Sequence, residues 1–184
     1  MNYGKFTDTI FSKVMLAVAL INNPEVSPEV RQFNLEILFR EVGSAVYAKI
    51  YDMNAFDFNI EHTTGAGIDE RYYGLAKKAS YSVSTGDAAI ADQVRNFLNQ
   101  CGAQAQQHAV ATARQSGHHP SASRRVVGTK NCKWCLSKVA ENVENPPAEF
   151  FHRHAGCDCE IITKGYKSRN GLLQNYVKPK DRES

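Results

Sequence analysis

Apolar residues recur at helical spacing along the first fifty residues of the chain. One apolar stripe runs from Phe6 to Ile21, and Asn22-Asn23-Pro24 ends it. Ser27-Pro28-Glu29 then combines a capping hydroxyl, a proline suited to the first turn and an acid that the helix dipole favours. The apolar period resumes and continues to about Tyr51. The pattern predicts two helices that pack as an antiparallel pair.

A second helical region follows a stretch of turn-forming residues. Between 52 and 68, aspartate, asparagine and glycine interrupt the period, which predicts a loop. A short tyrosine-rich helix is expected from Ile68 to Lys78. Ser84-Thr85-Gly86-Asp87 predicts the start of a further helix, and the period that follows to Arg114 is the longest in the chain.

The last third of the chain has a different pattern. The polar stretch from Gln115 to Ser123 predicts a linker, and short strands are expected at 124–128 and 160–163. The expected fold class is α+β, mainly α, with a helical N-terminal part and a small C-terminal β lobe. The predicted parts are a helical domain, a linker and a Cys/His lobe with a basic tail: residues 1–116, 117–123 and 124–184.

Composition places the chain among ordinary globular proteins. Apolar residues make up 42% and charged residues 22%, and the formal net charge is +3. No apolar run approaches the roughly 18 residues needed to cross a bilayer, and the first residues lack the pattern of an export signal. We therefore expect a protein of a reducing compartment, whose cysteines serve metal binding or catalysis rather than disulfides.

Cysteine and histidine gather in two groups in this lobe. Cys132 and Cys135 form a C-x2-C pair, whose spacing lets one tight turn direct two thiolates at one point. About 20 residues later, His154, Cys157 and Cys159 form an H-x2-C-x-C group. Two half-sites at this separation predict one tetrahedral zinc site.

Zinc takes four ligands, and these two groups offer five. Cys132, Cys135 and Cys157 are the firmest candidates, and the fourth is His154 or Cys159. His154 is slightly preferred, because a C-x-C pair chelates one ion only in a strained arrangement. Four protein ligands leave no position for water, so we expect a structural Zn²⁺, which a lobe this poor in apolar residues needs in order to fold.

Two other uses of the cysteines are weaker interpretations. A thioredoxin-like redox pair at Cys132 and Cys135 needs a β-α-β context, which the sequence pattern lacks. Disulfides need an oxidising compartment. Cys101 lies on the apolar face of a predicted helix and is expected to be a buried small hydrophobe. Trp134 is expected to pack over the paired cysteines rather than to stack on a nucleic-acid base.

Four features follow one another in the C-terminal third. They are an Arg-rich strand, a C-x2-C that encloses an aromatic residue, an H-x2-C-x-C and a β-branched strand: Arg124-Arg125-Val126-Val127-Gly128, Cys132-Lys133-Trp134-Cys135, His154-Ala155-Gly156-Cys157-Asp158-Cys159 and Ile161-Ile162. In these features the sequence resembles the MuF-like minor head proteins of tailed bacteriophages. The family's long helix would correspond to Asp87–Arg114, so the resemblance covers about residues 85–165. Ala155 stands where several members of the family have proline.

The resemblance implies a structural protein of the virion and not an enzyme. Such proteins lie in few copies near the portal and assist head assembly, genome packaging or delivery, so the expected partners are portal or major capsid protein. The expected location is the phage head, and the bacterial host cytoplasm during assembly. No membrane and no small-molecule substrate are expected. The basic residues from Arg124 to Arg182 are compatible with non-specific contact with the phosphates of packaged DNA.

One alternative is a zinc-scaffolded nuclease of the His-Asn-His (HNH) type. His152 or His154 would then be the general base, and Asn170 or Asn175 a supporting residue. Against this, the histidines stand where a ligand is needed, and no Asp–His pair stands beside a predicted strand.

A second alternative is a helical adaptor. Its apolar stripes at 6–21 and 30–50 would bind a partner protein instead of forming a core. Motifs of phosphate-binding loops, serine hydrolases and zinc proteases do not occur in the sequence.

Overall fold

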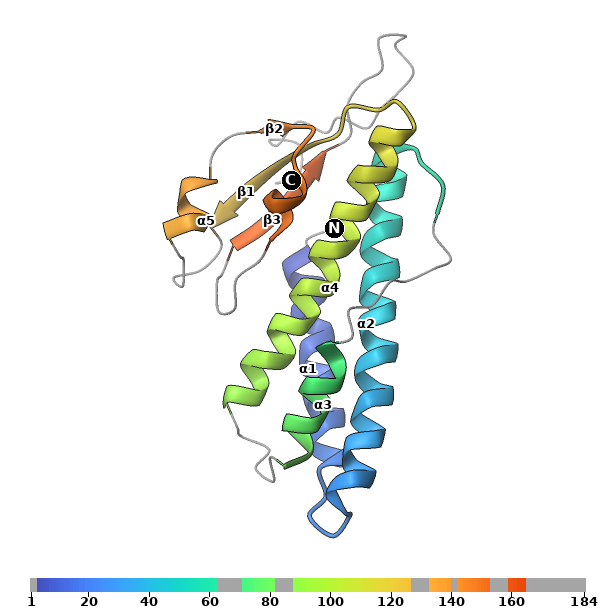
Figure 1. Ribbon diagram of the computed structural model, residues 1–184, viewed down its shortest axis with the longest axis vertical. Helices are drawn as coiled ribbons and strands as arrows, with labels where there is room; N and C mark the ends of the chain where they lie inside the picture. The colour runs from blue at the N-terminus through green and yellow to red at the C-terminus, as the bar shows by residue number, and fades with distance from the viewer. Residues whose placement is uncertain are drawn as a thin grey trace. The chain divides into compact units, whose positions relative to one another are not determined.

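The computed structural model describes most of the chain, in six stretches: residues 3–62, 71–81, 88–126, 133–139, 142–152 and 159–164. Within them the protein is mainly helical and has one three-stranded antiparallel sheet, which confirms the α+β, mainly α class (Figure 1). None of the described helices is long and apolar enough to cross a membrane.

The described residues fall into two compact units. We call the first the helical unit, and it comprises residues 3–49, 71–81 and 88–102. We call the second the sheet unit, and it comprises residues 50–62, 103–126, 133–139, 142–152 and 159–164. The division falls inside the two longest helices, so each of these contributes residues to both units.

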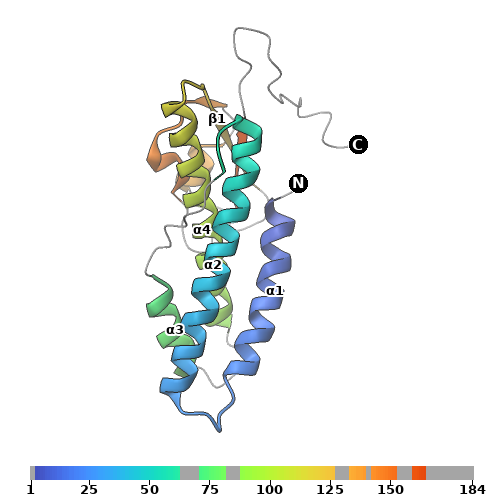
Figure 2. The same cartoon turned by 90° about the vertical axis from the view of Figure 1, so that its right-hand side faces the viewer.

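Four helices contribute to the helical unit: α1 (Tyr3–Ile21), α2 (Pro28–Phe58), α3 (Arg71–Tyr81) and α4 (Ala88–Gln115) (Figures 1 and 2). The start of α2 is where the sequence predicts it, and the Val30 N–H donates to Ser27 Oγ over 3.4 Å. The pKa of Glu29 lies below its ordinary value, first because its carboxylate accepts a backbone hydrogen bond and second because Ser27 also bonds it. Both effects favour the negative charge that suits a helix N-terminus.

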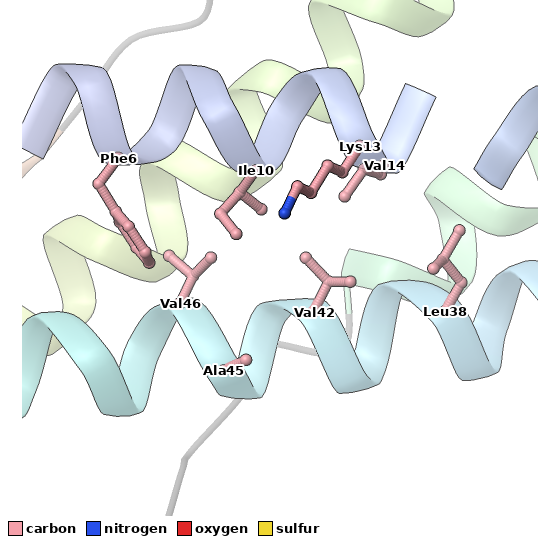
Figure 3. Close-up of a pocket in the computed structure, with 8 residues that line it drawn as sticks. All are labelled: Phe6, Ile10, Lys13, Val14, Leu38, Val42, Ala45 and Val46. Atoms are coloured by element: carbon pink, nitrogen blue, oxygen red, sulfur yellow. The ribbon is translucent and has the colours of Figure 1, made fainter. Parts of the chain in front are cut away.

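The helices α1 and α2 run antiparallel, as predicted. Phe6 lies near Val46, whereas Val14 lies toward Leu38, so the contacts run in opposite directions along the two helices (Figure 3). Together with their neighbours these side chains line an apolar groove of about 250 Å³. Lys13 also lines this groove.

Within the helical unit, α2 and α4 approach each other closely at Gly43. A Cβ atom at this position would lie 2.8 Å from Phe97 Cζ and 3.3 Å from Cys101 Sγ. The Phe97 ring also packs edge to face on Phe39, with the ring centroids 6.0 Å apart. Glycine therefore permits a helix spacing that a larger residue would oppose. Cys101 is buried, as predicted.

The sheet unit contains the three strands, in the order β2-β1-β3. They are β1 (Ser121–Val126), β2 (Val143–Glu144) and β3 (Cys159–Lys164), and both outer strands run antiparallel to β1. The register pairs Ser121 with Lys164 and Val126 with Cys159. A short helix, α5 (Lys133–Ser137), and a 3₁₀ helix, η1 (Ala148–Phe151), complete its described elements.

Buried polar contacts attach β3 to the helix segments that belong to the sheet unit. The Gln106 side chain of α4 donates to the Ile161 carbonyl over 2.9 Å. The Thr163 hydroxyl donates to the side-chain oxygen of Asn54 in α2, and both residues are buried. Because an unpaired buried polar group is costly, these contacts oppose any slip of β3 along the helices.

The prediction of a loop beginning at residue 52 was wrong, because α2 continues to Phe58. Asn54 is a turn former by propensity, but here its side chain is buried with hydrogen-bond partners, which offsets that preference. Asn59 directly follows the last residue of the helix, and its φ is 54°. The Ile60 N–H donates to the Ala55 carbonyl over 3.0 Å, which is the hydrogen bond of a Schellman end.

The strand prediction was correct for β3 and incomplete elsewhere. β1 begins at Ser121, inside the predicted linker, instead of at Arg124. Neither α5, β2 nor η1 was predicted, because each is too short to show a period. The predicted start of α3 at Ile68 and the capping residues 84–87 lie outside the described residues.

Candidate metal centre

Two of the five predicted zinc ligands lie within the described residues. Cys135 is the third residue of α5, and Cys159 is the first residue of β3. Cys132, His154 and Cys157 lie outside the described residues. Within the described part of the chain, no three Cys, His, Asp or Glu side chains form a metal-binding group.

The two described cysteines lie against each other. Their Sγ atoms are 3.5 Å apart, neither residue is in a disulfide, and both are buried, at 0% and 1% exposure. Two thiolates on one tetrahedral zinc lie about 3.8 Å apart, because each Zn–S bond is about 2.3 Å. The observed separation corresponds to an S–Zn–S angle of about 100° at that bond length. The pair therefore fits one edge of a tetrahedral zinc site.

The strand register brings these cysteines together. Cys159 stands opposite Val126, at the end of β1 from which the chain continues toward α5. Val139, shortly after α5, forms a parallel bridge with Arg124, so the chain returns to β1 directly after Cys135. Two positions that are 24 residues apart in sequence thus meet at one end of the sheet.

Arg124 is the residue of this centre that the sequence analysis did not predict. It lies at the middle of β1 and is only 2% exposed. Its Nη1 atom donates to Cys159 Sγ over 3.0 Å and to Cys135 Sγ over 3.6 Å. Its Nη2 atom donates to the backbone carbonyls of Phe150 and His152. One guanidinium thus contacts both cysteines and the chain directly after η1.

Aromatic rings surround the guanidinium. Its central carbon lies 4.9 Å from the centroid of the Trp134 ring and 5.5 Å from that of Phe150. Trp134 packs against Cys135 and Cys159, which confirms the packing role predicted for it. These rings attract the cation through their π faces and keep water away from it.

Arg125, the next residue, points to the opposite face of the sheet, because neighbouring residues of a strand alternate. It forms an ion pair with Glu160, its partner in the β1–β3 register, with Nη2 and Oε2 2.7 Å apart. The two arginines of the predicted Arg-rich strand therefore have different roles. Arg124 serves the cysteine pair, and Arg125 joins two strands. The sequence feature that could have indicated this role of Arg124 is its position in a predicted strand shortly before the C-x2-C pair.

His152, the candidate base of the nuclease alternative, is exposed beside the centre. Its ring lies edge to face with Trp134, with the centroids 6.3 Å apart. The redox alternative required a β-α-β unit around Cys135. The described strands on either side of α5 are antiparallel instead, so the context that a thioredoxin-like site needs is absent from the described sheet.

Comparisons with known proteins leave the function open. The chain matches no protein-family model, no curated protein and no solved structure. What this centre does therefore has to follow from its own residues and their geometry.

Proposed function

We propose that the chain is a structural or head-assembly protein of a tailed phage, and that one structural zinc ion stabilises its C-terminal lobe. The observation that supports the zinc is the buried pair Cys135 and Cys159, whose sulfur atoms lie 3.5 Å apart beside a guanidinium. The head-assembly role depends on the resemblance of the Cys/His region to MuF-like minor head proteins.

Four protein side chains would hold the ion. Cys132, Cys135 and Cys157 are three of them, as the sequence predicts. The position of Cys159 beside Cys135 favours Cys159 over His154 as the fourth. The ion would contribute no chemistry beyond cross-linking, because a site closed by four protein ligands has no open position for water or substrate.

The lobe has a physical need for such a cross-link. Its described elements are short, since α5 has five residues, β2 has two and β3 has six. Phe150, Phe151 and Ile161 are buried, but elements this short contribute few such residues, and small lobes commonly gain stability from a metal or from disulfides. Binding zinc would join α5 to the start of β3, which the described backbone hydrogen bonds do not do.

Elemental analysis of protein purified without added metal tests the zinc site, with a matched pair of variants. We expect one zinc per chain in the wild type and in Cys101→Ser, whose cysteine lies in the helical unit. Cys159→Ser should lose most of the metal, and a chelator should lower the melting temperature of the wild type to that of this variant. A metal-free wild type in which mass spectrometry finds Cys135 and Cys159 oxidised to a disulfide would reject the zinc site.

The head-assembly role needs a separate experiment. Particles of a phage that encodes this chain, purified and treated with nuclease and protease, should contain it by mass spectrometry, at few copies relative to the major capsid protein. Particles that lack the chain would reject the virion location but would leave the zinc site untouched.

Contact with packaged DNA would have to come from a subset of the basic residues. Arg114 donates to the Pro146 carbonyl, and Arg124 and Arg125 are used inside the lobe. Lys133 and Lys138 are exposed. Phosphate contacts would make the affinity for duplex DNA fall linearly with salt on logarithmic axes. An affinity that does not change with salt would argue against this contact.

The adaptor alternative has one observation in its favour. The helical unit exposes large apolar side chains on α1 and α2, including Leu16 at 69%, Leu20 at 81% and Phe33 at 62%. The same stripes also supply the core, since Val14 and Phe39 are buried. Sedimentation over a hundredfold range of concentration separates the two roles: a stable monomer indicates a core only, whereas an oligomer that Leu20→Lys dissociates indicates an interface.

A further inference from the structure

Arg124 is a buried cation without a carboxylate partner among the described residues. The residue is 2% exposed, and the described hydrogen-bond acceptors of its guanidinium are two sulfur atoms and two backbone carbonyls. Its Nε atom has no hydrogen-bond partner within the part of the chain that the structure describes. A guanidinium removed from water is unfavourable unless negative charge lies close to it. The acceptors able to carry that charge are the cysteine sulfurs.

The hydrogen bonds of the guanidinium also hold two parts of the centre in place. Nη1 points to the sulfur pair, which joins α5 to the start of β3. Nη2 points to the carbonyls of Phe150 and His152. His152 precedes the candidate ligand group by two residues in the sequence. One side chain therefore fixes both described ligands and the chain that leads to the others.

We propose that Arg124 is the positioning residue of the metal centre: its hydrogen bonds hold Cys135 and Cys159 as ligands, and its charge favours a centre with at least three thiolates. This inference rests on the proposed zinc site. Four thiolates on Zn²⁺ give a centre with charge −2, and three thiolates with one neutral histidine give −1. Either is stabilised by an adjacent buried cation, whereas a neutral centre with two thiolates is not.

Lysine cannot replace arginine in this role. The planar guanidinium has five N–H donors in a fixed fork, so it reaches sulfur with one nitrogen and carbonyls with the other. An ammonium group carries its three donors on one nitrogen, so it cannot place two separate nitrogens against the sulfur pair and the carbonyls as the guanidinium does. The guanidinium also lies over the rings of Trp134 and Phe150, and a planar group packs on aromatic faces better than an ammonium does.

Zinc affinity, measured at one fixed pH by competition with a chromophoric chelator, tests the inference. We expect Arg124→Lys and Arg124→Gln to bind zinc roughly 10- to 100-fold more weakly than the wild type, as is usual when an outer-shell partner is lost. Arg125→Gln is the matched control, because Arg125 is the neighbouring residue and pairs with Glu160 on the other face. Its affinity should stay within about threefold of the wild type, well below the outer-shell effect.

Two results would overturn the inference while leaving the zinc site in place. One is a zinc affinity of both Arg124 variants equal to that of the wild type. The other is an equal loss in Arg125→Gln, which would show a general effect of weakening the sheet. A wild type that binds no zinc would instead reject the proposed function itself.

Cobalt substitution of the wild type supplies a test that needs no variant to fold. The thiolate-to-cobalt charge-transfer absorption grows with each thiolate ligand, and we expect the intensity of at least three. An intensity of two or fewer would overturn the inference. Two acidic residues flank Cys159 in the sequence, and of these Glu160 pairs with Arg125, so Asp158→Asn tests the other possible source of negative charge. It should leave the affinity unchanged, and a loss equal to that of Arg124→Lys would identify Asp158 as the counter-charge instead.

Discussion

Replacing Gly43 by alanine isolates the close approach of α2 and α4. The new Cβ would lie 2.8 Å from Phe97 Cζ, closer than real Cβ contacts come. The ring cannot simply swing away, because Phe97 is 7% exposed and packs on Phe39. Gly74 in α3 is the control, since a Cβ there would meet nothing within 4 Å.

Both substitutions gain helix propensity, but only Gly43→Ala also introduces a steric clash. Alanine in place of glycine inside a helix stabilises by about 1 kcal/mol at either site. Overpacking at Gly43 costs about 1–3 kcal/mol. We therefore expect Gly74→Ala to be more stable than the wild type, and Gly43→Ala to be less stable than Gly74→Ala by about 1–3 kcal/mol, because the helix propensity cancels.

Urea denaturation followed by far-UV circular dichroism measures this difference, provided that the m-values agree. Phe97→Leu removes the atom nearest to the new Cβ, so in that background Gly43→Ala should become neutral or stabilising. Equal stability of the two alanine variants, or a persistent penalty in the Phe97→Leu background, would refute the steric argument.

Substitutions at three further positions test individual features of the fold. Gln106→Leu leaves the buried Ile161 carbonyl without its donor and should destabilise the protein by about 1–3 kcal/mol in urea unfolding. Asn59→Ala forces alanine into a positive φ, so it should cost about 1–2 kcal/mol, whereas Asn59→Gly should not. The pKa of Glu29 is lower in the folded protein than its ordinary value. Its contribution to the free energy of unfolding is therefore complete above the ordinary carboxyl pKa, and it is lost as the pH falls through the lowered pKa of the folded state. Melting temperatures of Glu29→Gln should therefore fall less than those of the wild type over that acidic range.

Head-assembly function and zinc binding stand on different observations and can fail separately. The zinc proposal rests on two buried sulfurs at ligand separation and on the cation beside them. The proposal of a virion role rests on the order of motifs in the sequence. The experiments above are paired accordingly, so that a negative result for one proposal does not remove the other.

The sequence by itself predicted the main helices and pointed to the paired cysteines of the C-terminal lobe as a candidate metal site. The apolar period of α1, α2 and α4 depends only on local spacing, and the Ser27-Pro28-Glu29 start depends on groups that lie within one turn of each other. The paired cysteines could be recognised because their spacing in sequence is itself the signal for metal binding.

The tertiary structure decided what depends on residues far apart in the chain. It extends α2 past Tyr51, because Asn54 finds buried partners, one of them more than a hundred residues away in sequence. It gives β1 its length through pairing with β2 and β3. It also brings Cys159 to Cys135 and places the Arg124 guanidinium between them and the Phe150 carbonyl. No local pattern could predict these contacts, because a strand register joins positions that the sequence leaves dozens of residues apart.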